Sequence, residues 1–399
     1  MMSEFRKVRN ILVIKLRHIG DVLLAAPVFS ALRKNFPGAN ISALVNSGTQ
    51  EVLSGNPDID EIITLDRDII KNNPFKRYRS ELSFLKKIRQ KRFDMTVDLT
   101  SGDRAAILSF FSGARYRLAY DPAGGGFMGK RFLYTHISKK YGNQHMVLQN
   151  VDILRQSGIT TNDFTVNFFI PEETKIFVKR IFEKNNINEN DKIVHLHPTS
   201  RWLFKCWEDE HTAKVIEWLL EQGVKVIVTS APDERELEKV KNILSLCSSP
   251  VTSRPSLLLD LSGKTDIKQL AAISSVSSLF LGVDTAPMHI AAAVGTPVIA
   301  LFGPTGAFDW GPWDNSKGQG ASRYDSIPGG ERRESPYKKR NGIQTYGIHT
   351  VIQKAWECVP CGKDGCNGAK TSKCLEEITV EEIKNLLAEK LRMSNKNGK

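Results

Sequence analysis

The sequence is poor in cysteine and has no long apolar run. Six Cys in 399 residues are too few for a disulfide scaffold, so a reducing cytosol is the expected compartment. No apolar run approaches the roughly 20 residues that span a bilayer. The run ILVIKL at 11–16 is also too short for the apolar region of a signal peptide. These absences argue against a secreted or membrane-spanning protein.

Two common ligand-binding motifs are missing as well. No G-x-G-x-x-G fingerprint joins a strand to a helix, because the GGG run at 124–126 is followed by Phe127 and Met128 without such a turn. A nicotinamide cofactor is therefore not expected. No Asp-x-Asp pair lies in a strand-end loop where it could hold a divalent ion, so no metal cofactor is expected either.

The composition is that of an ordinary globular protein, with 41% apolar and 25% charged residues. At roughly 150 residues per domain, this length predicts two or three domains. Lys and Arg number 56 against 44 Asp and Glu, a formal net charge of +12. This excess favours polyanions, phosphate esters or an acidic membrane surface as partners.

Short β-branched runs alternate with longer amphipathic stretches. The predicted strands are 11–16, 41–46, 61–66, 95–100 and 116–121 in the first half, and 192–197, 224–230, 279–284 and 297–303 in the second. The predicted helices are 21–35, 80–91, 208–222, 233–246, 266–276, 286–294 and 380–393. Continuous apolar strands separated by helices indicate parallel sheets covered on both faces.

The two series are separated by a polar, Asn-rich stretch at 184–191. We therefore expect an α/β protein of two Rossmann-like domains that face each other across a cleft, one over 1–185 and one over 186–378. The remaining 379–399 are expected to form a C-terminal helix and a disordered tail. Residues 303–347 are rich in Gly, Pro and charge, which predicts a long surface loop.

Ligands of such sheets bind outside the carboxyl ends of the strands, where helix N-termini attract anions. After the first strand, Gly20 forms the turn and Asp21 begins a helix, either as its N-cap or as a catalytic residue. After His197, two hydroxyl groups and two cations suit a diphosphate. The residues concerned are Thr199, Ser200, Arg201 and Lys205. Alternatively, Thr199 or Ser200 caps the next helix. Lys205, which lies among aromatic residues, is not expected to be a purely solvated lysine.

Two further strand ends carry polar residues. Asp284 and Thr285 close one strand, and His289 follows Thr285 at i+4 on a small, apolar helix. This is the strongest site signal in the sequence, although His289 could instead be a core histidine. Asp233 and Glu234 open another helix, where they either accept from a sugar hydroxyl or serve as solvated capping acids.

Four cysteines lie within 17 residues near the C-terminus. Cys358, Cys361, Cys366 and Cys374 have the spacing C-x2-C-x4-C-x7-C. This spacing matches neither a zinc ribbon nor a ferredoxin motif. A structural zinc ion is one interpretation but not the favoured one, and reduced thiols or a labile disulfide are the others.

Together these motifs resemble the ADP-heptose:lipopolysaccharide heptosyltransferases of glycosyltransferase family 9, which have the GT-B fold. The resemblance runs from about residue 10 to 378. It rests on R-H-I-G-D-V, H-P-T-S-R-x-x-x-K-C-W, S-A-P-D-E and G-V-D-T-A-P-M-H-I-A-A-A-x-G-T-P. The segments SGDRAA, GPTGAFDWGPW and CVPCGKDGC are most similar to the heptosyltransferase III branch.

The resemblance implies roles for single residues. Asp21 falls at the position of the base that takes the proton of the acceptor hydroxyl. Asp284 falls where the family contacts the heptose, and Glu234 where it places an acid on the nucleotide side. The residues expected to hold the donor diphosphate are Thr199, Ser200, Lys205, Thr285, Ala286 and His289. Relatives often carry Ser or Thr where this chain has His18, two residues before Gly20. His18 could contact the acceptor or a phosphate, or simply face solvent, and both His18 and Gly20 are expected on the acceptor side.

The implied reaction is an inverting transfer of heptose from ADP-heptose to the lipopolysaccharide inner core, with Lys205 stabilising the departing ADP and no metal required. Two alternatives are a family 9 transferase for another core position or nucleotide sugar, and a sugar-nucleotide-binding protein without catalysis.

Residues 67–92 contain ten Lys or Arg and two acids. Such a run is commonly a solvated face. Given the implied acceptor, we expect it instead to contact acceptor phosphates, with Arg77 and Arg79 as candidates, and the anionic cytoplasmic face of the inner membrane. The aromatic residues within the run belong to no recognised nucleic-acid module, so nucleic acid is not an expected partner.

Overall fold

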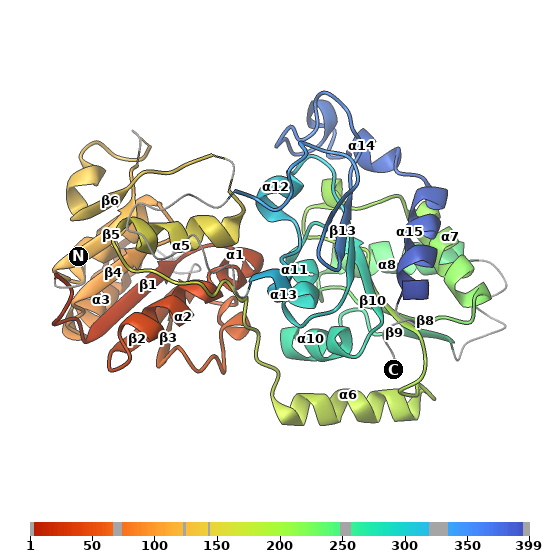
Figure 1. Ribbon diagram of the computed structural model, residues 1–399, viewed down its shortest axis with the longest axis horizontal. Coiled ribbons are helices and arrows are strands. Elements are labelled where there is room, and N and C mark those ends of the chain that lie inside the picture. Colours follow the sequence, from red (N-terminus) through yellow and green to blue (C-terminus); the bar gives the residue numbers. More distant parts are fainter. Residues whose placement is uncertain are drawn as a thin grey trace. The chain divides into compact units, whose positions relative to one another are not determined.

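The computed structural model describes residues 4–66, 74–122, 125–142, 144–247, 257–318 and 334–393. They form two compact units, each built on one sheet (Figure 1). Unit 1 contains the chain up to Phe169, and unit 2 contains most of the chain from Ile170 onward. The two predicted α/β sheets are therefore confirmed.

Unit 1 has a six-stranded sheet in the order β3-β2-β1-β4-β5-β6, and every neighbouring pair is parallel. Its strands are β1 (Asn10–Lys15), β2 (Asn40–Asn46), β3 (Glu61–Leu65), β4 (Met95–Asp98), β5 (Tyr116–Tyr120) and β6 (His136–Ser138). The central β1 is buried from Ile11 to Lys15 because other chain segments cover both faces. All five strands predicted for this half are confirmed.

Helices cover the sheet of unit 1. They are α1 (Ile19–Leu23), α2 (Ala26–Asn35), α3 (Pro74–Gln90), α4 (Asp103–Phe111), α5 (Met146–Gln156), and the 3-10 turns η1 (Gln50–Val52) and η3 (Lys130–Leu133). On one face, Ile88 of α3 and Leu108 of α4 pack with Ile14 of β1. The single helix predicted over 21–35 is two helices, because Pro27 has no N–H with which to continue α1.

Unit 2 has a seven-stranded sheet in the order β12-β13-β11-β10-β7-β8-β9. Its strands are β7 (Ile193–His197), β8 (Lys225–Val228), β9 (Leu258–Asp260), β10 (Leu279–Val283), β11 (Val298–Leu301), β12 (Gln344–Tyr346) and β13 (His349–Ile352). Only the β12–β13 pair among these is antiparallel. The four strands predicted for this half are confirmed.

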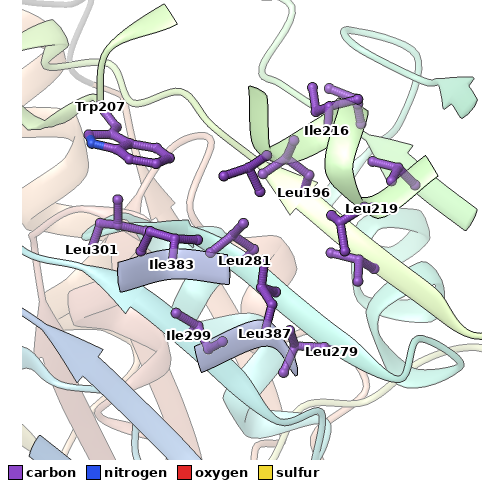
Figure 2. Close-up of a cluster of buried hydrophobic side chains, with 14 of the residues drawn as sticks. Leu196, Trp207, Ile216, Leu219, Leu279, Leu281, Ile299, Leu301, Ile383 and Leu387 are labelled. Carbon is purple, nitrogen blue, oxygen red and sulfur yellow. The ribbon is translucent and has the colours of Figure 1, made fainter. Parts of the chain in front are cut away.

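The longer helices of unit 2 surround this sheet. They are α6 (Glu172–Lys184), α7 (Asp209–Glu221), α8 (Glu234–Leu246), α10 (Ile267–Ser275), α11 (Ala286–Ala293) and α15 (Val380–Met393). Figure 2 shows part of its core, where Trp207, Leu281 and Ile383 meet from distant parts of the chain. None of the helices in the described part of the chain has the length and apolar character needed to cross a bilayer.

The units divide at other places than the predicted domain boundaries. Unit 2 already includes α6, which lies before the boundary expected after residue 185, because Val178 and Phe182 pack with Ile273 of α10. Helix α15, expected over 379–399 as a separate segment, belongs to the core of unit 2. The predicted disordered tail at 394–399 lies outside the described residues.

The long surface loop predicted over 303–347 is wrong for the part that the structure describes. Residues 303–318 and 334–347 contain α12 (Ala307–Trp310), α13 (Asn315–Gly318) and β12. Tyr337 is buried and donates from its hydroxyl to the Pro312 carbonyl at 2.8 Å. The buried Tyr337 thus anchors a segment whose Gly, Pro and charged composition is typical of a surface loop.

Candidate active site

The carboxyl end of β1 leads into the turn that contains Asp21. His18 is the N-cap of α1, with extended backbone, and Asp21 lies in the first helical turn. His18 is exposed, whereas Gly20 and Asp21 are half-buried. The alternative that Asp21 is the N-cap is wrong, because His18 takes that position.

Lys15 is a polar residue of this strand end that the motifs do not reveal. Its side chain is only 3% exposed. Its Nζ donates to the Leu99 carbonyl at 3.2 Å and to Asn150 Oδ1 at 3.0 Å. Burial lowers the pKa of Lys15 to about 8, while attraction to the Asp21 carboxylate opposes that shift. Asp21 thus has a buried cation in its electrostatic neighbourhood.

A buried carboxyl group fixes the adjacent strand end. Asp98, the last residue of β4, accepts from the Tyr134 hydroxyl at 2.5 Å and from the Thr100 N–H at 2.7 Å. Thr100 Oγ1 accepts from the Leu16 N–H at 2.8 Å. Burial raises the pKa of Asp98, although the hydrogen bonds from Tyr134 and Thr100 act in the opposite direction. The ends of β1 and β4 are tied together, which supports the turn before Asp21.

The predicted acceptor-side arginines lie on α3. Arg79 is exposed near the start of this helix. The side chain of Arg77 lies outside the described residues. The structure therefore places Arg79 on the surface of unit 1 and leaves its role as a prediction.

In unit 2, the end of β7 presents two buried hydroxyl groups. Thr199 Oγ1 donates to Glu236 Oε2 at 2.7 Å. Ser200 Oγ accepts from the Trp202 N–H at 3.2 Å. The alternative that either residue caps the next helix is wrong, because Trp202 is the N-cap of the following 3-10 turn η4 (Leu203–Lys205). These hydroxyl groups instead shape the loop at the strand end.

The acid that contacts this loop is Glu236. Its side chain is buried and also accepts from the Ala231 N–H at 3.4 Å. Glu234 is exposed at the first position of α8, and Asp233 is the N-cap that accepts from the Arg235 N–H at 3.2 Å. The capping interpretation is confirmed for Asp233. Glu236 lies two residues beyond the acid that the motif predicts for the nucleotide side.

The ends of β7 and β10 are joined by an ion pair. Lys205 Nζ lies 2.6 Å from Asp284 Oδ2, and both side chains are mostly buried. The same Asp284 oxygen accepts from Thr305 Oγ1 at 2.5 Å. Gln353 Nε2 donates to the Thr305 carbonyl at 2.8 Å, so the loop after β11 is also held. The prediction that Lys205 is not a purely solvated lysine is confirmed.

Helix α11 begins directly beside this ion pair. Thr285 is its N-cap with extended backbone, and its side chain makes no capping hydrogen bond. Thr285 and Ala286 are half-buried, and His289 is buried one turn later. The first N–H groups of a helix have no acceptor within it, so this end attracts anions. The structure thus brings Lys205, Asp284 and Thr285 to one edge, as the motifs predict.

Two neutral histidines lie behind the loop. His195 Nε2 and His197 Nδ1 both hydrogen-bond Thr229 Oγ1, at 2.8 and 2.9 Å. His195 Nδ1 also hydrogen-bonds Ser274 Oγ at 2.8 Å. Burial lowers the pKa of both His195 and His197 to about 3. This uncharged chain of hydrogen bonds connects β7 to the residue after β8.

The four clustered cysteines are free thiols. Among the residues that the structure describes, no three His, Cys, Asp or Glu side chains are placed to hold a metal ion. Burial, and then the neighbouring thiols of Cys366 and Cys361, raise the pKa of Cys374 to about 11. No disulfide joins these four thiols in the structure, and the metal content of the cluster stays a prediction.

Two Rossmann-like units, each built on a largely parallel sheet, make up the GT-B fold, which solved heptosyltransferase structures share. Residues 81–338 match glycosyltransferase family 9 (heptosyltransferase), and the chain belongs to this family. It is 34% identical over 317 residues to the lipopolysaccharide heptosyltransferase 3 of Escherichia coli K12, covering 78% of this chain and 88% of that protein. The family resemblance of the motifs is thereby confirmed.

Solved structures of E. coli proteins share the fold. The ADP-heptose lps heptosyltransferase II superposes with a TM-score of 0.71 at 17% identity, covering 97% of this chain and 99% of that one. The heptosyltransferase WaaC, solved with ADP-2-deoxy-2-fluoro heptose, gives a TM-score of 0.64 at 17% identity, covering 95% and 99%. At such identities these structures establish the GT-B fold and not the roles of single residues.

Proposed function

We propose that this enzyme transfers a heptose from ADP-heptose to a heptose of the lipopolysaccharide inner core, with inversion at the anomeric carbon. The observation that carries the proposal is the cluster of Lys205, Asp284 and Thr285 at the strand ends of unit 2. The relative named lipopolysaccharide heptosyltransferase 3 supports this acceptor class, and the WaaC complex with an ADP-heptose analogue supports the donor.

The donor is proposed to bind to unit 2. Its diphosphate would lie at the N-terminus of α11, where helix N–H groups and the Lys205 ammonium stabilise negative charge. Asp284, already next to that ammonium, would accept from heptose hydroxyl groups. The remaining donor residues are proposed to be Thr199, Ser200, Ala286 and His289. Glu236 is better placed than Glu234 for the nucleoside, because it is buried against the Thr199 loop.

Asp21 is proposed as the general base. It would take the proton of the acceptor hydroxyl while that oxygen bonds to the anomeric carbon. The bond from that carbon to the diphosphate breaks, and its electron pair leaves on ADP. One carboxylate suffices for this single displacement, unlike the two of a glycosidase. Lys15 supports this role, because its buried ammonium attracts the Asp21 carboxylate and so places a cation in the electrostatic neighbourhood of the proposed base.

Charge on the departing ADP is proposed to be stabilised by Lys205 and the α11 N-terminus without a divalent metal. Preorganised donors of this kind are commonly the largest contribution to catalysis. Addition of excess EDTA should therefore leave turnover unchanged. A loss restored by Mg²⁺ would contradict this part of the proposal.

The acceptor is proposed to bind to unit 1, near His18, Gly20, Arg77 and Arg79. The inner core is phosphorylated and anchored in a membrane, so basic residues on α3 would contact anionic groups. The enzyme is accordingly proposed to act on the cytoplasmic face of the inner membrane as a peripheral protein.

The test of the base is Asp21→Asn, assayed with ADP-heptose and a deacylated core acceptor. We expect turnover to fall by at least about 100-fold, because the proton acceptor is lost. Affinity for ADP should not change. The matched control is Glu173→Gln, which removes an exposed first-turn carboxylate from α6. Wild-type turnover in Asp21→Asn would remove the proposed base.

The test of the phosphate site is Lys205→Met, measured by calorimetric titration with ADP. Loss of a charge-assisted hydrogen bond should weaken binding by about 10- to 100-fold. The control is Lys225→Met, because Lys225 pairs with Asp191 at 3.2 Å at the opposite end of the strands. An unchanged ADP affinity in Lys205→Met would overturn the assignment.

The nucleotide is tested by thermal shift with ADP, UDP and GDP. A larger stabilisation by ADP is expected, and equal shifts would favour a transferase for another nucleotide sugar. Binding of ADP without turnover of any donor would favour the non-catalytic alternative.

A further inference from the structure

The outer face of α4 in unit 1 is apolar. The inner face buries Ala105, Ala106 and Leu108 against the sheet, as expected of a helix that covers it. The outer face would ordinarily be polar. Instead, Ile107 and Phe110 are 36% and 43% exposed. They lie three residues apart, so they share one stripe that the described sheet and helices of unit 1 leave partly exposed.

The apolar face continues onto the two neighbouring elements. Leu82 of α3 is 48% exposed. Phe111, at the end of α4, is 50% exposed. Phe132 of η3 and Met128 just before η3 are 84% and 100% exposed. The loop before η3 thus projects a fully exposed methionine next to an exposed phenylalanine. Large apolar groups exposed together mark interaction sites on otherwise soluble proteins. We call the group the α3–α4–η3 surface; its residues are Leu82, Ile107, Phe110, Phe111, Met128 and Phe132.

Side-chain contacts show that these three elements are adjacent. Glu81 of α3 forms an ion pair with Arg104 of α4. Lys130 of η3 lies 3.1 Å from Asp103 of α4. The guanidinium of Arg117 covers the Phe110 ring, at 5.6 Å from its centre.

The same Arg117 also donates to the Leu133 carbonyl at 2.6 Å, so the end of η3 lies next to Phe110. On the other side of α4, Ile107 and Phe111 follow Arg104 at i+3 and i+7 and share its stripe toward α3. The exposed apolar residues therefore lie on elements that contact one another.

Exposed cations lie on α3 and beside α4, the elements that carry this surface. Lys86 and Lys87 are exposed on α3, and Arg115 is exposed after α4. The acids nearby, Glu81 and Asp103, already pair with cations. An apolar centre with a cationic rim is complementary to a bilayer with anionic headgroups.

We propose that the α3–α4–η3 surface docks on an anionic membrane, with Phe111, Met128 and Phe132 entering the headgroup region and Lys86 and Lys87 contacting lipid phosphates. The proposal rests on the proposed function only in that a lipid-anchored acceptor requires an enzyme at the membrane. It assigns a contact to α4 and η3, which the basic stretch 67–92 does not include.

The test is sedimentation of the full chain with sucrose-loaded vesicles, either phosphatidylcholine alone or mixed with phosphatidylglycerol. Wild type should bind the anionic vesicles, and 0.5 M salt should release most of it because charge is screened. Lys86→Gln with Lys87→Gln should weaken the binding by about 25-fold, at about fivefold per charge. Equal binding to both vesicle types would overturn the proposal.

The apolar contribution is tested by Phe111→Ser with Met128→Ser and Phe132→Ser. All three side chains are exposed, so folding should be unaffected, and vesicle binding should fall by at least about tenfold. The matched control is Ile176→Ser with Phe177→Ser, which removes two comparably exposed residues from α6 of unit 2. An equal loss in the control, or none in the triple variant, would overturn the proposal.

Two readouts separate this inference from its rivals. Sedimentation equilibrium should show that the wild-type chain does not self-associate through this surface. If the wild-type chain self-associates and the triple variant does not, the surface joins two copies and the proposal fails. Vesicle binding involves no sugar nucleotide, so it can fail while transfer to a deacylated acceptor persists. The triple variant should keep full turnover with that soluble acceptor.

Discussion

At the scale of single residues, burial makes the cysteine thiols of this chain differ in expected reactivity. Cys358 and Cys361 are exposed. Burial raises the pKa of Cys206, Cys247 and Cys374 from 9.0 to about 11. Since the thiolate is the reactive form, this lowers the reactive fraction by about 100-fold.

We therefore expect iodoacetamide to modify Cys358 and Cys361 well before Cys374 at pH 7.5. Timed quenching followed by peptide mass spectrometry measures each rate. In urea, where burial is lost, the rates should become similar, which serves as the control. If Cys374 reacts as fast as Cys358 in the folded chain, the arrangement of the four thiols described above is wrong.

The site residues that could be predicted from the sequence lie in segments that follow a recognisable strand. Asp284, Thr285 and Lys205 are of this kind, and the structure brings them together. Lys15 and Glu236 could not be predicted, because they lie within a strand and a helix and not in a motif, so only contacts with distant residues reveal them. Lys15 bonds a side chain 135 residues away, and Glu236 bonds one 37 residues away.

At the scale of elements, long strands and amphipathic helices were predictable because their apolar period is local. Helix α4 could not be predicted from its apolar period. Ile107 and Phe110 are exposed while Leu108 is buried, so apolar residues lie on both its outer and its inner face. The segment 303–347 has the composition of a loop, but Tyr337 is buried by residues distant in sequence. Sequence composition does not carry that information.

Helix α15 is an element whose contribution can be measured. Ile383 and Leu387 are buried in the core of unit 2 (Figure 2). Leu387→Ala should lower the free energy of unfolding by about 2–5 kcal/mol, because it leaves a cavity. Urea unfolding followed by tryptophan fluorescence measures the change.

The control for this prediction lies on the same helix. Leu386 is only partly buried against the core, so Leu386→Ala should lower the free energy of unfolding by less. If Leu387→Ala unfolds at the same urea concentration as wild type, α15 is not part of the core.

At the scale of the whole molecule, the two units can be observed separately. Each has its own buried clusters. All six tryptophans lie in unit 2, at positions 202, 207, 218, 310, 313 and 356. Tryptophan fluorescence therefore reports on unit 2 alone, whereas circular dichroism reports on both units.

Unit 2 should lose stability in mild acid. Burial lowers the pKa of His195 and His197 to about 3, so the folded chain keeps both rings neutral. The unfolded chain protonates them near pH 6.5. Acid thus adds protons to the unfolded state only, and stability falls as the pH falls from about 6.5 toward 3. From pH 7 to 5 the two rings together should remove about 3–4 kcal/mol.

Urea unfolding at a series of pH values, followed by tryptophan fluorescence, tests this expectation. Burial also lowers the pKa of His349 of unit 2 to about 4, so His197→Asn removes one of three such rings. It should reduce the histidine contribution to the slope by about a third. The matched control is His136→Gln, which removes a histidine of unit 1 that lies 3.3 Å from Glu4. It should leave the fluorescence transition unchanged at every pH. A slope in His197→Asn equal to that of wild type would mean that this ring is already charged in the folded chain, and the neutral connection between β7 and the residue after β8 would have to be abandoned.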